Sequence, residues 1–363
     1  MHICHVTSSF KGGAATATRH MAKHQIGAGH RVTLVHPTDP DRCEAVSHYL
    51  PPRVTTVAWS IRREIGPLED LRALHQLLSI VRGLAPDILH LHCSKAGFLG
   101  RVVARRLAIP SVYSPRGVAF LRRDVSRLTR YAYRRLEQIA ASFGGTVVAC
   151  SPSEFAVLSA YLGSVAMIPN GIDLAEIDAL VSADRANESQ RDDRFTIAIC
   201  GSINEARNPW LVREIIAASP RTWRWQWIGD GHLRPVVESN GNLEILGWLD
   251  RRDALKRLAQ ADVVLHASAW DGMPNAVLEA MALGIPVVAS RGEGNIDVVA
   301  DGATGFLCER RDEFVGALEY LETAPERRIN LSKAARQRVE REFEIGLVMQ
   351  RWSTLYGQVL GSS

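Results

Sequence analysis

The segment from Trp270 to Ala282, WDGMPNAVLEAMA, carries the residues with the clearest chemical potential. It follows an apolar run at 263–266 that predicts a strand, and Pro274 suits the first turn of a helix because its missing N–H is not needed there. The amides of a helix N-terminus attract phosphate or sugar oxygens. Asp271 before the helix and Glu279 within it can accept hydrogen bonds from hydroxyls. The sequence thus predicts a pocket for a phosphorylated, polyhydroxylated ligand.

The backbone expected to line this pocket is a run of six residues: Gly272, Met273, Pro274, Asn275, Ala276 and Val277. Two carboxylates could also serve a glycosidase, but retaining glycosidases hold theirs about 5–5.5 Å apart. Eight positions along a helix span roughly 12 Å, which disfavours that use. From the residues alone, an ordinary strand–loop–helix with a solvated Asp271 and a surface Glu279 remains the alternative.

Loops after other predicted strands add glycines and two arginines. Gly12 and Gly13 stand between the first strand and a helix, where glycine lets the backbone approach a phosphate or sugar, although a plain tight turn would look the same. Arg207 can bind phosphate through charge-assisted, bidentate contacts, or it can be a solvated surface arginine. Arg116 stays protonated, so it can bind phosphate but cannot act as a base.

Further short motifs occur in order along nearly the whole chain. They are Gly12-Gly13, His92–Gly97, Pro169–Asp173, Arg207–Pro209, Gly229–Gly231 and Gly302–Leu307, together with Asp271 and Glu279. As an ordered set they resemble the family 4 retaining glycosyltransferases, in which the first acidic residue is usually Glu. The resemblance implies the GT-B fold, an α/β architecture of two facing Rossmann-like domains with parallel sheets.

The resemblance also implies roles for residues in the second half. Glu279 would bind the donor ribose, Asp271 a sugar hydroxyl and Arg207 the donor diphosphate. A further basic residue usually follows Gly201 in the family, where this chain has Ser202. The loops expected to line the nucleotide base and ribose contain Gly229, Gly247 and Trp248.

In the first half, the resemblance assigns Gly12 and Gly13 to the cleft where donor and acceptor meet. Arg116 occupies the position where many relatives carry a His that contacts the transferred sugar or its phosphate. We hypothesise that Arg116 binds phosphate and partly replaces the basic group missing at Ser202. No nucleophile is apparent, so we expect a front-face reaction assisted by the leaving phosphate, through positioning and electrostatic stabilisation.

Length and composition suit a globular protein of two domains. The chain has 363 residues, of which 46% are hydrophobic and 23% charged, and no apolar run approaches the ~20 residues of a membrane span. The six cysteines show no paired short spacing, which favours a reduced compartment. The N-terminus lacks a signal-peptide pattern. We therefore expect a cytoplasmic protein, with a peripheral location on the inner face of the cytoplasmic membrane as a second option.

Apolar strand-like runs alternate with helical patterns, which predicts parallel sheets. Strands are expected at 2–7, 31–36, 87–91, 111–114, 146–150, 195–200, 223–228, 243–246, 262–266 and 286–290. Helices are expected near 14–28, 69–83, 96–107, 121–141, 153–161, 208–218, 251–260, 274–283, 311–323 and 325–341. We expect an acceptor-side domain at 1–170 and a nucleotide-sugar-binding domain at 171–344. By resemblance, a C-terminal helix at about 345–363 joins the first domain.

Positive charge gathers in the first half. Residues 1–190 carry 22 Lys and Arg against 15 Asp and Glu, a net of +7, and the remainder has a net of −3. The predicted helix at 121–141 adds six arginines to an apolar set at helical spacing: Leu121, Val125, Leu128, Ala132, Leu136 and Ile139. Such a helix suits an anionic membrane surface, and equally a helix packed on the sheet with a solvated arginine face. No nucleic-acid-reading motif is present, so nucleic acid is not an expected partner.

His90 and His92 share one face of a predicted strand, being two residues apart. A metal site needs more ligands than these two, and the sequence assigns no others, so both are expected in the core or the cleft. We predict no essential metal and no cofactor beyond the substrate, a UDP- or GDP-linked sugar.

The combined observations predict a retaining glycosyltransferase. It would move a sugar from a nucleoside-diphosphate sugar to a glycan acceptor, such as a lipid-diphosphate-linked oligosaccharide in bacterial O-antigen, capsule or exopolysaccharide synthesis. Two alternatives stay open. One is a soluble enzyme acting on a small molecule such as an antibiotic precursor. The other is a catalytically silent sugar-nucleotide-binding protein, which the unusual Arg116, Ser202 and Asp271 would fit.

Overall fold

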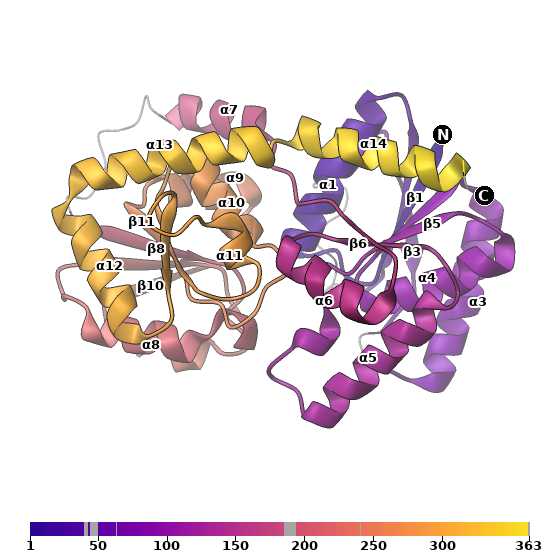
Figure 1. Cartoon of the computed structure of the whole chain (residues 1–363), viewed down its shortest axis with the longest axis horizontal. Coiled ribbons are helices and arrows are strands. Elements are labelled where there is room, and N and C mark those ends of the chain that lie inside the picture. The colour runs from indigo at the N-terminus through magenta and orange to yellow at the C-terminus, as the bar shows by residue number, and fades with distance from the viewer. Residues whose placement is uncertain (40–42, 44–49, 63, 185–193, 240, 362–363) are drawn as a thin grey trace. The chain divides into compact units, whose positions relative to one another are not determined.

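The computed structural model describes residues 1–361 apart from 40–42, 44–49, 63, 185–193 and 240. The chain divides into two compact units, Met1–Gly171 with Ile345–Ser363, and Ile172–Glu344. Each unit is a parallel sheet covered by helices (Figure 1). This architecture follows from the alternation of apolar strands with helices, because a parallel sheet is buried on both faces.

The first unit contains a seven-stranded sheet in the order β3-β2-β1-β4-β5-β6-β7, with every neighbouring pair parallel. Its strands are β1 His2–Thr7, β2 Arg31–Pro37, β3 Thr55–Trp59, β4 Ile88–His92, β5 Ser111–Ser114, β6 Thr146–Ala149 and β7 Val165–Met167. The register pairs His5 of β1 with His90 of β4. The direction of chain progression reverses between these two strands, where ligands of open α/β sheets usually bind.

Helices cover both faces of this sheet. They are α1 Gly12–Gly27, α3 Pro67–Leu84, α4 Ser94–Leu107, α5 Arg127–Ala141, α6 Pro152–Leu162 and α14 Ile345–Gly361. The C-terminal α14 lies beside α1, far from it in sequence (Figure 1). There Ile3, Ile88 and Val112 of the sheet form a core with Trp352 of α14. The last helix therefore completes the hydrophobic core of the first unit.

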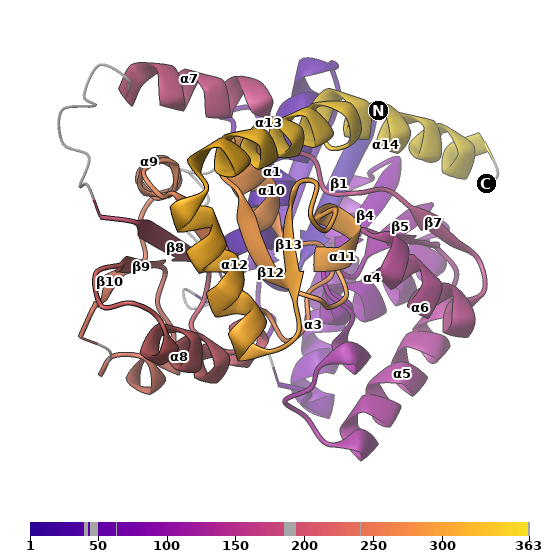
Figure 2. The same ribbon diagram turned by 60° about the vertical axis from the view of Figure 1, so that its left-hand side comes forward.

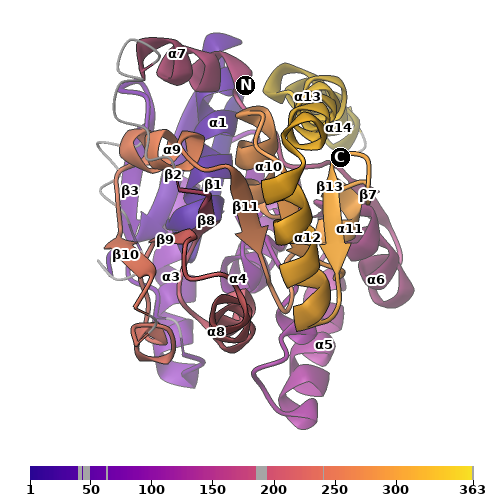
Figure 3. The same cartoon turned by 90° about the vertical axis from the view of Figure 1, so that its left-hand side faces the viewer.

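The second unit contains a six-stranded parallel sheet in the order β10-β9-β8-β11-β12-β13. Its strands are β8 Thr196–Cys200, β9 Arg224–Ile228, β10 Leu243–Gly247, β11 Val263–His266, β12 Val287–Ser290 and β13 Gly305–Cys308. Its helices are α7 Leu174–Asp184, α8 Pro209–Ala218, α9 Arg251–Ala259, α10 Asn275–Ala282, α11 Asn295–Val298, α12 Arg311–Thr323 and α13 Pro325–Glu342. Helix α12 lies along β12 and β13 and next to α8 (Figure 2), and α9 neighbours α10 (Figure 3).

Three strands and one long helix lie outside the predicted set. The strands β3, β7 and β13 are all sheet edges, and β3 and β7 are largely exposed or half-buried. The sequence of β3 begins with two threonines and β7 has only three residues, so neither gives the long apolar run of a strand buried on both faces. Helix α7 was also missed, although it carries Glu176, which contributes to the site described below.

One predicted helix start is wrong by six residues, and Pro274 lies just before its helix and not in the first turn. Helix α5 begins at Arg127 and not at 121, because the Ser126 side chain caps it by accepting from the Thr129 amide at 3.1 Å. Helix α10 begins at Asn275, so Pro274 precedes the helix with an extended backbone (φ −75°, ψ 107°). The Pro274 carbonyl then accepts the first helical bonds, from the amides of Val277 and Leu278.

Candidate active site

The charged residues predicted in the second unit meet beyond the carboxyl ends of β8 and β11. These strands are hydrogen-bonded neighbours, and the chain reverses its progression across the sheet between them. Burial raises the pKa of the Cys200 thiol at the end of β8 to about 12. The charge of Glu279 also raises this pKa, and the charges of Arg207 and Arg251 lower it. These three charges therefore lie near the end of β8, at the switch between sheet halves where ligands of such folds usually bind.

Arg207 and Asp271 form an ion pair. Nη1 of Arg207 donates to Oδ2 of Asp271 at 2.8 Å, and the His266 Nε2 lies 3.8 Å from the same oxygen. Burial alone would raise the pKa of Asp271, but Arg207 and His266 together more than offset it and the pKa falls to about 2. Asp271 is thus an anion at neutral pH, and Arg207 is held in place before any ligand arrives.

The backbone positions this pair. Arg207 ends a short 3-10 turn, Glu205–Arg207, in which the Asn204 side chain accepts from the Arg207 amide at 3.3 Å. The Ala269 amide donates to the Ala206 carbonyl at 2.8 Å, which joins this turn to the loop that carries Asp271. The two loops are therefore tied together on either side of the ion pair.

Glu279 is held by an arginine that the sequence did not single out. Nη1 of Arg251 donates to Oε1 of Glu279 at 2.5 Å, and its Nε donates to Oε1 of Glu176 at 3.0 Å. Burial lowers the pKa of Arg251, but Glu279 and Glu176 more than reverse this and raise it above its usual value. Glu279 is buried with an exposed fraction of 8%, so the surface alternative for it is wrong.

The predicted glycine loops pack directly on one another. A Cβ at Gly229 would lie 2.2 Å from the Gly201 carbonyl oxygen, and one at Gly231 would lie 2.3 Å from that of Ile203. Gly229 also donates its amide to the Gly247 carbonyl at 2.9 Å. Glycine is therefore required here by close backbone packing, whatever the loops bind. Ser202 is half-buried between these glycines, and Trp248 is half exposed beside them.

Part of the loop before α10 is already used in contacts within the protein. Met273 is buried, and the Val277 amide already donates to the Pro274 carbonyl at 3.1 Å, so it is not an open donor for a ligand. The loop rests on Gly294, where a Cβ would lie 2.9 Å from the Asp271 carbonyl oxygen and 3.0 Å from that of Gly272. The predicted open amide at Val277 is therefore contradicted, because a backbone bond to the residue three positions earlier already uses its N–H.

In the first unit, Arg116 points inward and has no ion-pair partner in the part of the chain that the structure describes. Its Nη1 donates to the Asn170 Oδ1 at 2.7 Å and its Nη2 contacts the Met21 sulfur at 3.3 Å. Nε is buried and takes no hydrogen bond among the described residues. The residue has a left-handed backbone (φ 57°), which is strained for a side chain other than glycine. A half-buried cation in this position suits an anionic group.

Gly12 and Gly13 begin α1 at the carboxyl end of β1. Gly12 adopts a left-handed backbone (φ 55°), and nothing lies within 4 Å of where its Cβ would be. The open space in front of this turn would allow a substrate close approach. The geometry suits a ligand-facing turn as well as a plain one, so the predicted role stays a prediction.

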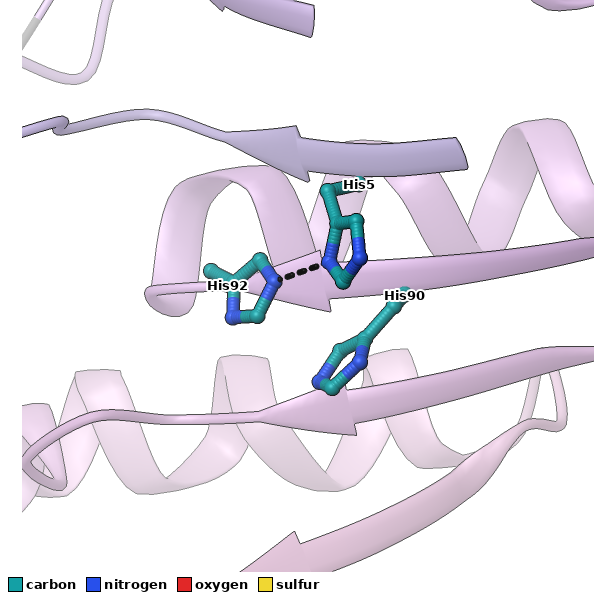
Figure 4. A group of neighbouring side chains, drawn as sticks. All are labelled: His5, His90 and His92. Atoms are coloured by element: carbon teal, nitrogen blue, oxygen red, sulfur yellow. Dashed lines mark hydrogen bonds between the residues drawn. The ribbon is translucent and has the colours of Figure 1, made fainter. Parts of the chain in front are cut away.

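His90 and His92 are fully buried, as predicted, and a third histidine joins them. His5 comes from the neighbouring β1, and its Nδ1 lies 2.9 Å from the Nε2 of His92 (Figure 4). Candidate ligand nitrogens of all three lie within 4.8 Å of one another. The sequence missed His5 because only the β1–β4 register brings it opposite His90.

The surroundings of this cluster favour neutral imidazoles over protonated ones and over a bound metal ion. His5 also bonds the Gln25 Oε1 at 2.7 Å, and His90 bonds the Tyr356 hydroxyl at 2.7 Å and the Ser114 hydroxyl at 3.0 Å. Burial lowers the pKa of all three histidines, that of His5 to about 4, and the Arg116 charge lowers it further. A nearby arginine disfavours a bound metal ion for the same reason.

Helix α5 turns its apolar stripe outward. The exposed fractions are 78% for Leu128, 36% for Leu136 and 46% for Ile139. The inward face carries Glu137 instead, which accepts from Arg101 at 2.8 Å and from the Tyr113 hydroxyl at 2.8 Å. Helix α5 thus packs in the unit through Glu137 and Ala140 and not through the predicted apolar stripe, and its membrane contact stays a prediction. In the described residues, no helix has the length and apolarity to cross a membrane.

Models of known families match both units. Residues 11–176 match the model described as Glycosyltransferase Family 4, and residues 237–338 match the one described as Glycosyl transferases group 1. The two matches together span most of the chain. The chain is therefore a glycosyltransferase with a family 4 first unit and a group 1 second unit.

Relatives of this glycosyltransferase include polysaccharide enzymes. The UDP-Gal:alpha-D-GlcNAc-diphosphoundecaprenol alpha-1,3-galactosyltransferase of Escherichia coli is 27% identical over 322 residues, 81% of either chain. The capsular polysaccharide biosynthesis glycosyltransferase CapM of Staphylococcus aureus is 23% identical over 335 residues, 84% of this chain and 85% of its own.

Solved structures share the fold. The structure of Anabaena HepE in complex with UDP and glucose has a TM-score of 0.81 at 17% identity, covering 99% of this chain and 100% of that one. The two parallel-sheet, Rossmann-like units are those of a GT-B glycosyltransferase, as predicted. The protein is accordingly an enzyme, and a retaining mechanism fits its family.

Proposed function

We propose that this glycosyltransferase transfers a sugar, with retention, from a nucleoside-diphosphate sugar to a lipid-diphosphate-linked glycan in bacterial surface polysaccharide synthesis. The activity in the name of the E. coli relative, with its diphosphoundecaprenol acceptor, supports this acceptor class. The capsule role in the name of CapM supports the polysaccharide context. The UDP and glucose in the HepE complex support a nucleotide-sugar donor.

The observation that carries the donor site is the gathering of Arg207, Asp271 and Glu279 around the switch point of the second sheet. Arg207 would bind the donor diphosphate and stabilise the charge that develops as the phosphate leaves. Asp271 would accept from a sugar hydroxyl. Glu279 would accept from the ribose. Gly201, Ser202, Gly229, Gly247 and Trp248 would surround the nucleotide.

The chemistry that these residues supply is positioning and electrostatic. Nη1 of Arg207 lies 2.8 Å from Oδ2 of Asp271 and helps to keep this carboxylate ionised. An ionised carboxylate can accept a hydrogen bond from a sugar hydroxyl. A front-face reaction assisted by the leaving phosphate needs a preorganised cation more than a nucleophile. We therefore propose that transfer requires no metal, because Arg207 supplies positive charge to the diphosphate.

In the first unit, Arg116 would bind an anionic group of a substrate. Its inward side chain, its unpaired Nε and its strained backbone support this role. Gly12 and Gly13 at the start of α1 would let the substrate approach the backbone. The first unit would thus take the acceptor side of the reaction.

Helix α5 would rest on an anionic membrane surface. Its exposed Leu128, Leu136 and Ile139 would enter the interface, with arginines of the same helix beside the lipid phosphates. A lipid-linked acceptor lies in such a surface, so this contact would bring enzyme and acceptor together. The enzyme would work at the inner face of the cytoplasmic membrane.

The first experiment is a thermal-shift screen with UDP, GDP, dTDP and their common sugars. A ligand that binds the folded protein raises its melting temperature by mass action. We expect a clear shift with UDP or GDP compounds, followed by turnover with a lipid-diphosphate acceptor and an axial or equatorial product bond that matches the donor. Binding without turnover on any acceptor would favour the silent sugar-nucleotide-binding protein. Turnover only on a lipid-free small molecule would favour the soluble alternative.

A further inference from the structure

One buried arginine joins two glutamates from different helices beside the donor site. Arg251 is the first residue of α9, Glu176 lies in the first turn of α7, and Glu279 lies in α10. Arg251 bonds Glu279 through Nη1 and Glu176 through Nε, at 2.5 and 3.0 Å. The side chains are only 13%, 11% and 19% exposed for Arg251, Glu279 and Glu176. Shielded ion pairs of this kind fix side-chain geometry more firmly than surface pairs do.

The geometry leaves half of the Glu279 carboxylate unused. Only Oε1 meets Arg251, and Oε2 has no hydrogen-bond partner among the residues that the structure describes. Nη2 of Arg251 is buried and likewise unpartnered in the described part of the chain. A bidentate Arg–Glu pair would use two guanidinium nitrogens and both carboxylate oxygens. Glu176 holds the Nε of Arg251, which excludes a side-on pair through Nε and Nη2 and fixes Arg251 beside Glu279.

We propose that Arg251, restrained by Glu176, is a positioning residue that keeps one oxygen of Glu279 available to the hydroxyls of a nucleotide ribose. The inference rests on the proposed function and deepens it by naming what the site recognises: a ribonucleotide over its deoxy counterpart. A carboxylate already held in one rotamer loses little conformational freedom on binding. A deoxyribose would lack the hydroxyl that this oxygen accepts from, which costs affinity.

The charges of the cluster favour separate positions for the ribose and the diphosphate. Two carboxylates and one guanidinium leave a net negative charge around Glu279, which repels phosphate but accepts from a neutral hydroxyl. Arg207 offers the opposite sign near the same point beyond β8. The diphosphate is thereby directed toward Arg207 and the ribose toward Glu279, which sets the orientation of the donor.

The test measures the dissociation constants of UDP and GDP, and of their 2′-deoxy and 3′-deoxy counterparts, by calorimetry. For the wild type we expect at least one deoxy form of the bound nucleotide to bind roughly tenfold more weakly, the effect of one hydrogen bond to a charged group. In Arg251→Gln this ratio should fall toward one. Glu176→Ala should lower it too, because Arg251 then loses the contact that holds its Nε. Arg251→Lys should restore part of the ratio, since it keeps a cation at the site.

A matched control separates positioning from simple anchoring. Arg336 bonds Asp178 of α7 at 2.8 and 2.9 Å and the Ala282 carbonyl of α10 at 2.7 Å, so it secures the same two helices without touching Glu279. Arg336→Gln should lower the melting temperature yet keep the ribose-to-deoxyribose ratio. KM for the donor should rise in Arg251→Gln and stay near wild type in Arg336→Gln.

The outcomes are distinct. A wild type that binds no nucleotide overturns the proposed function, and this inference with it. A wild type that discriminates against deoxyribose while Arg251→Gln discriminates equally well overturns only the role of Arg251. Equal loss of the ratio in Arg336→Gln would also overturn it, because helix anchoring would then explain the effect.

Discussion

At the scale of single residues, the donor-site candidates are already paired before a ligand binds. Asp271 stands where the family usually has Glu, and its short side chain meets Arg207 at 2.8 Å. The arginine therefore needs no reorganisation when phosphate charge develops, which is the condition under which a fixed charge lowers a barrier most. The chain lacks a second basic residue at Ser202, so Arg207 should carry most of this stabilisation.

We therefore expect Arg207→Gln to lower kcat by about 100-fold, the usual cost of removing one preorganised electrostatic contact. Asp271→Asn should also lower kcat, because Arg207 then loses the partner that orients it, whereas Asp271→Glu should retain more activity. Steady-state kinetics with the donor found in the screen would measure this. The control is Arg224→Gln, which removes the exposed pair with Glu244 in the same unit.

An Arg207→Gln variant with wild-type kcat would contradict the assigned role, whatever its donor affinity. Loss of activity in Arg224→Gln as well would point to a general weakening of the second unit. Melting temperatures of all variants distinguish the two cases.

The sequence predicted the site through local patterns and missed what depends on distant contacts. Asp271 and Arg207 lie in loops that directly follow strands, and Glu279 lies in the next helix, so their motifs are readable one at a time. Arg251 and Glu176 are 75 residues apart and meet only through the packing of α7 on α9. His5 and His92 are 87 residues apart and meet only through strand register. No local signal marks either pair.

At the scale of elements, α5 shows why periodicity gives a stripe but not its direction. An amphipathic pattern normally places apolar residues inward. Here Glu137 takes the inner position, because Arg101 and Tyr113 satisfy its carboxylate in the core. The apolar stripe then faces out, although its spacing in the sequence is that of a packed helix. The edge strands β3 and β7 were missed for a related reason, since short or half-exposed strands lack a long apolar run.

We expect α5 to bind vesicles that contain phosphatidylglycerol more tightly than vesicles of phosphatidylcholine alone, with an affinity that falls as salt rises. Replacing Leu128, Leu136 and Ile139 by Gln should weaken this binding at least tenfold, because each side chain contributes apolar area to the interface. Co-sedimentation with vesicles would measure it.

The matched control uses exposed leucines on another helix of the same unit. Leu68 and Leu71 of α3 are 67% and 50% exposed, so replacing them by Gln removes similar apolar area without touching α5. Equal binding by the α5 variant and the wild type would refute the membrane role. Equal loss in the α3 variant would place the contact elsewhere on this unit.

At the scale of the whole molecule, the two units bury different kinds of side chain. The second is built around Trp223, Trp225 and Trp227, which are almost fully buried in one cluster. The first surrounds its histidines with polar partners from β1, β4, α1 and α14. Tyr356 of α14 bonds His90, and the Trp352 ring centroid lies 4.6 Å from that of His90. The C-terminal helix is thus attached to the sheet through groups that must stay neutral.

This arrangement makes the stability of the first unit depend on pH. Burial holds the pKa of His5 near 4 and those of His90 and His92 well below 6.5, so the unfolded chain binds more protons than the folded one in this range. The stabilisation is complete above pH 6.5 and is lost as pH falls toward 4. Each histidine that stays neutral should cost about 1 kcal/mol of unfolding free energy per pH unit over that window.

Urea unfolding between pH 7.5 and 5 would measure the slope. We expect His90→Gln to flatten it, because one neutral group no longer titrates on unfolding, even though the variant is less stable at every pH. His75, which is solvent-exposed on α3, provides the control, and His75→Gln should leave the slope nearly unchanged. A wild-type free energy that does not fall between pH 6.5 and 5 would mean that the cluster can accept protons without breaking, and that α14 is not held by neutral histidines.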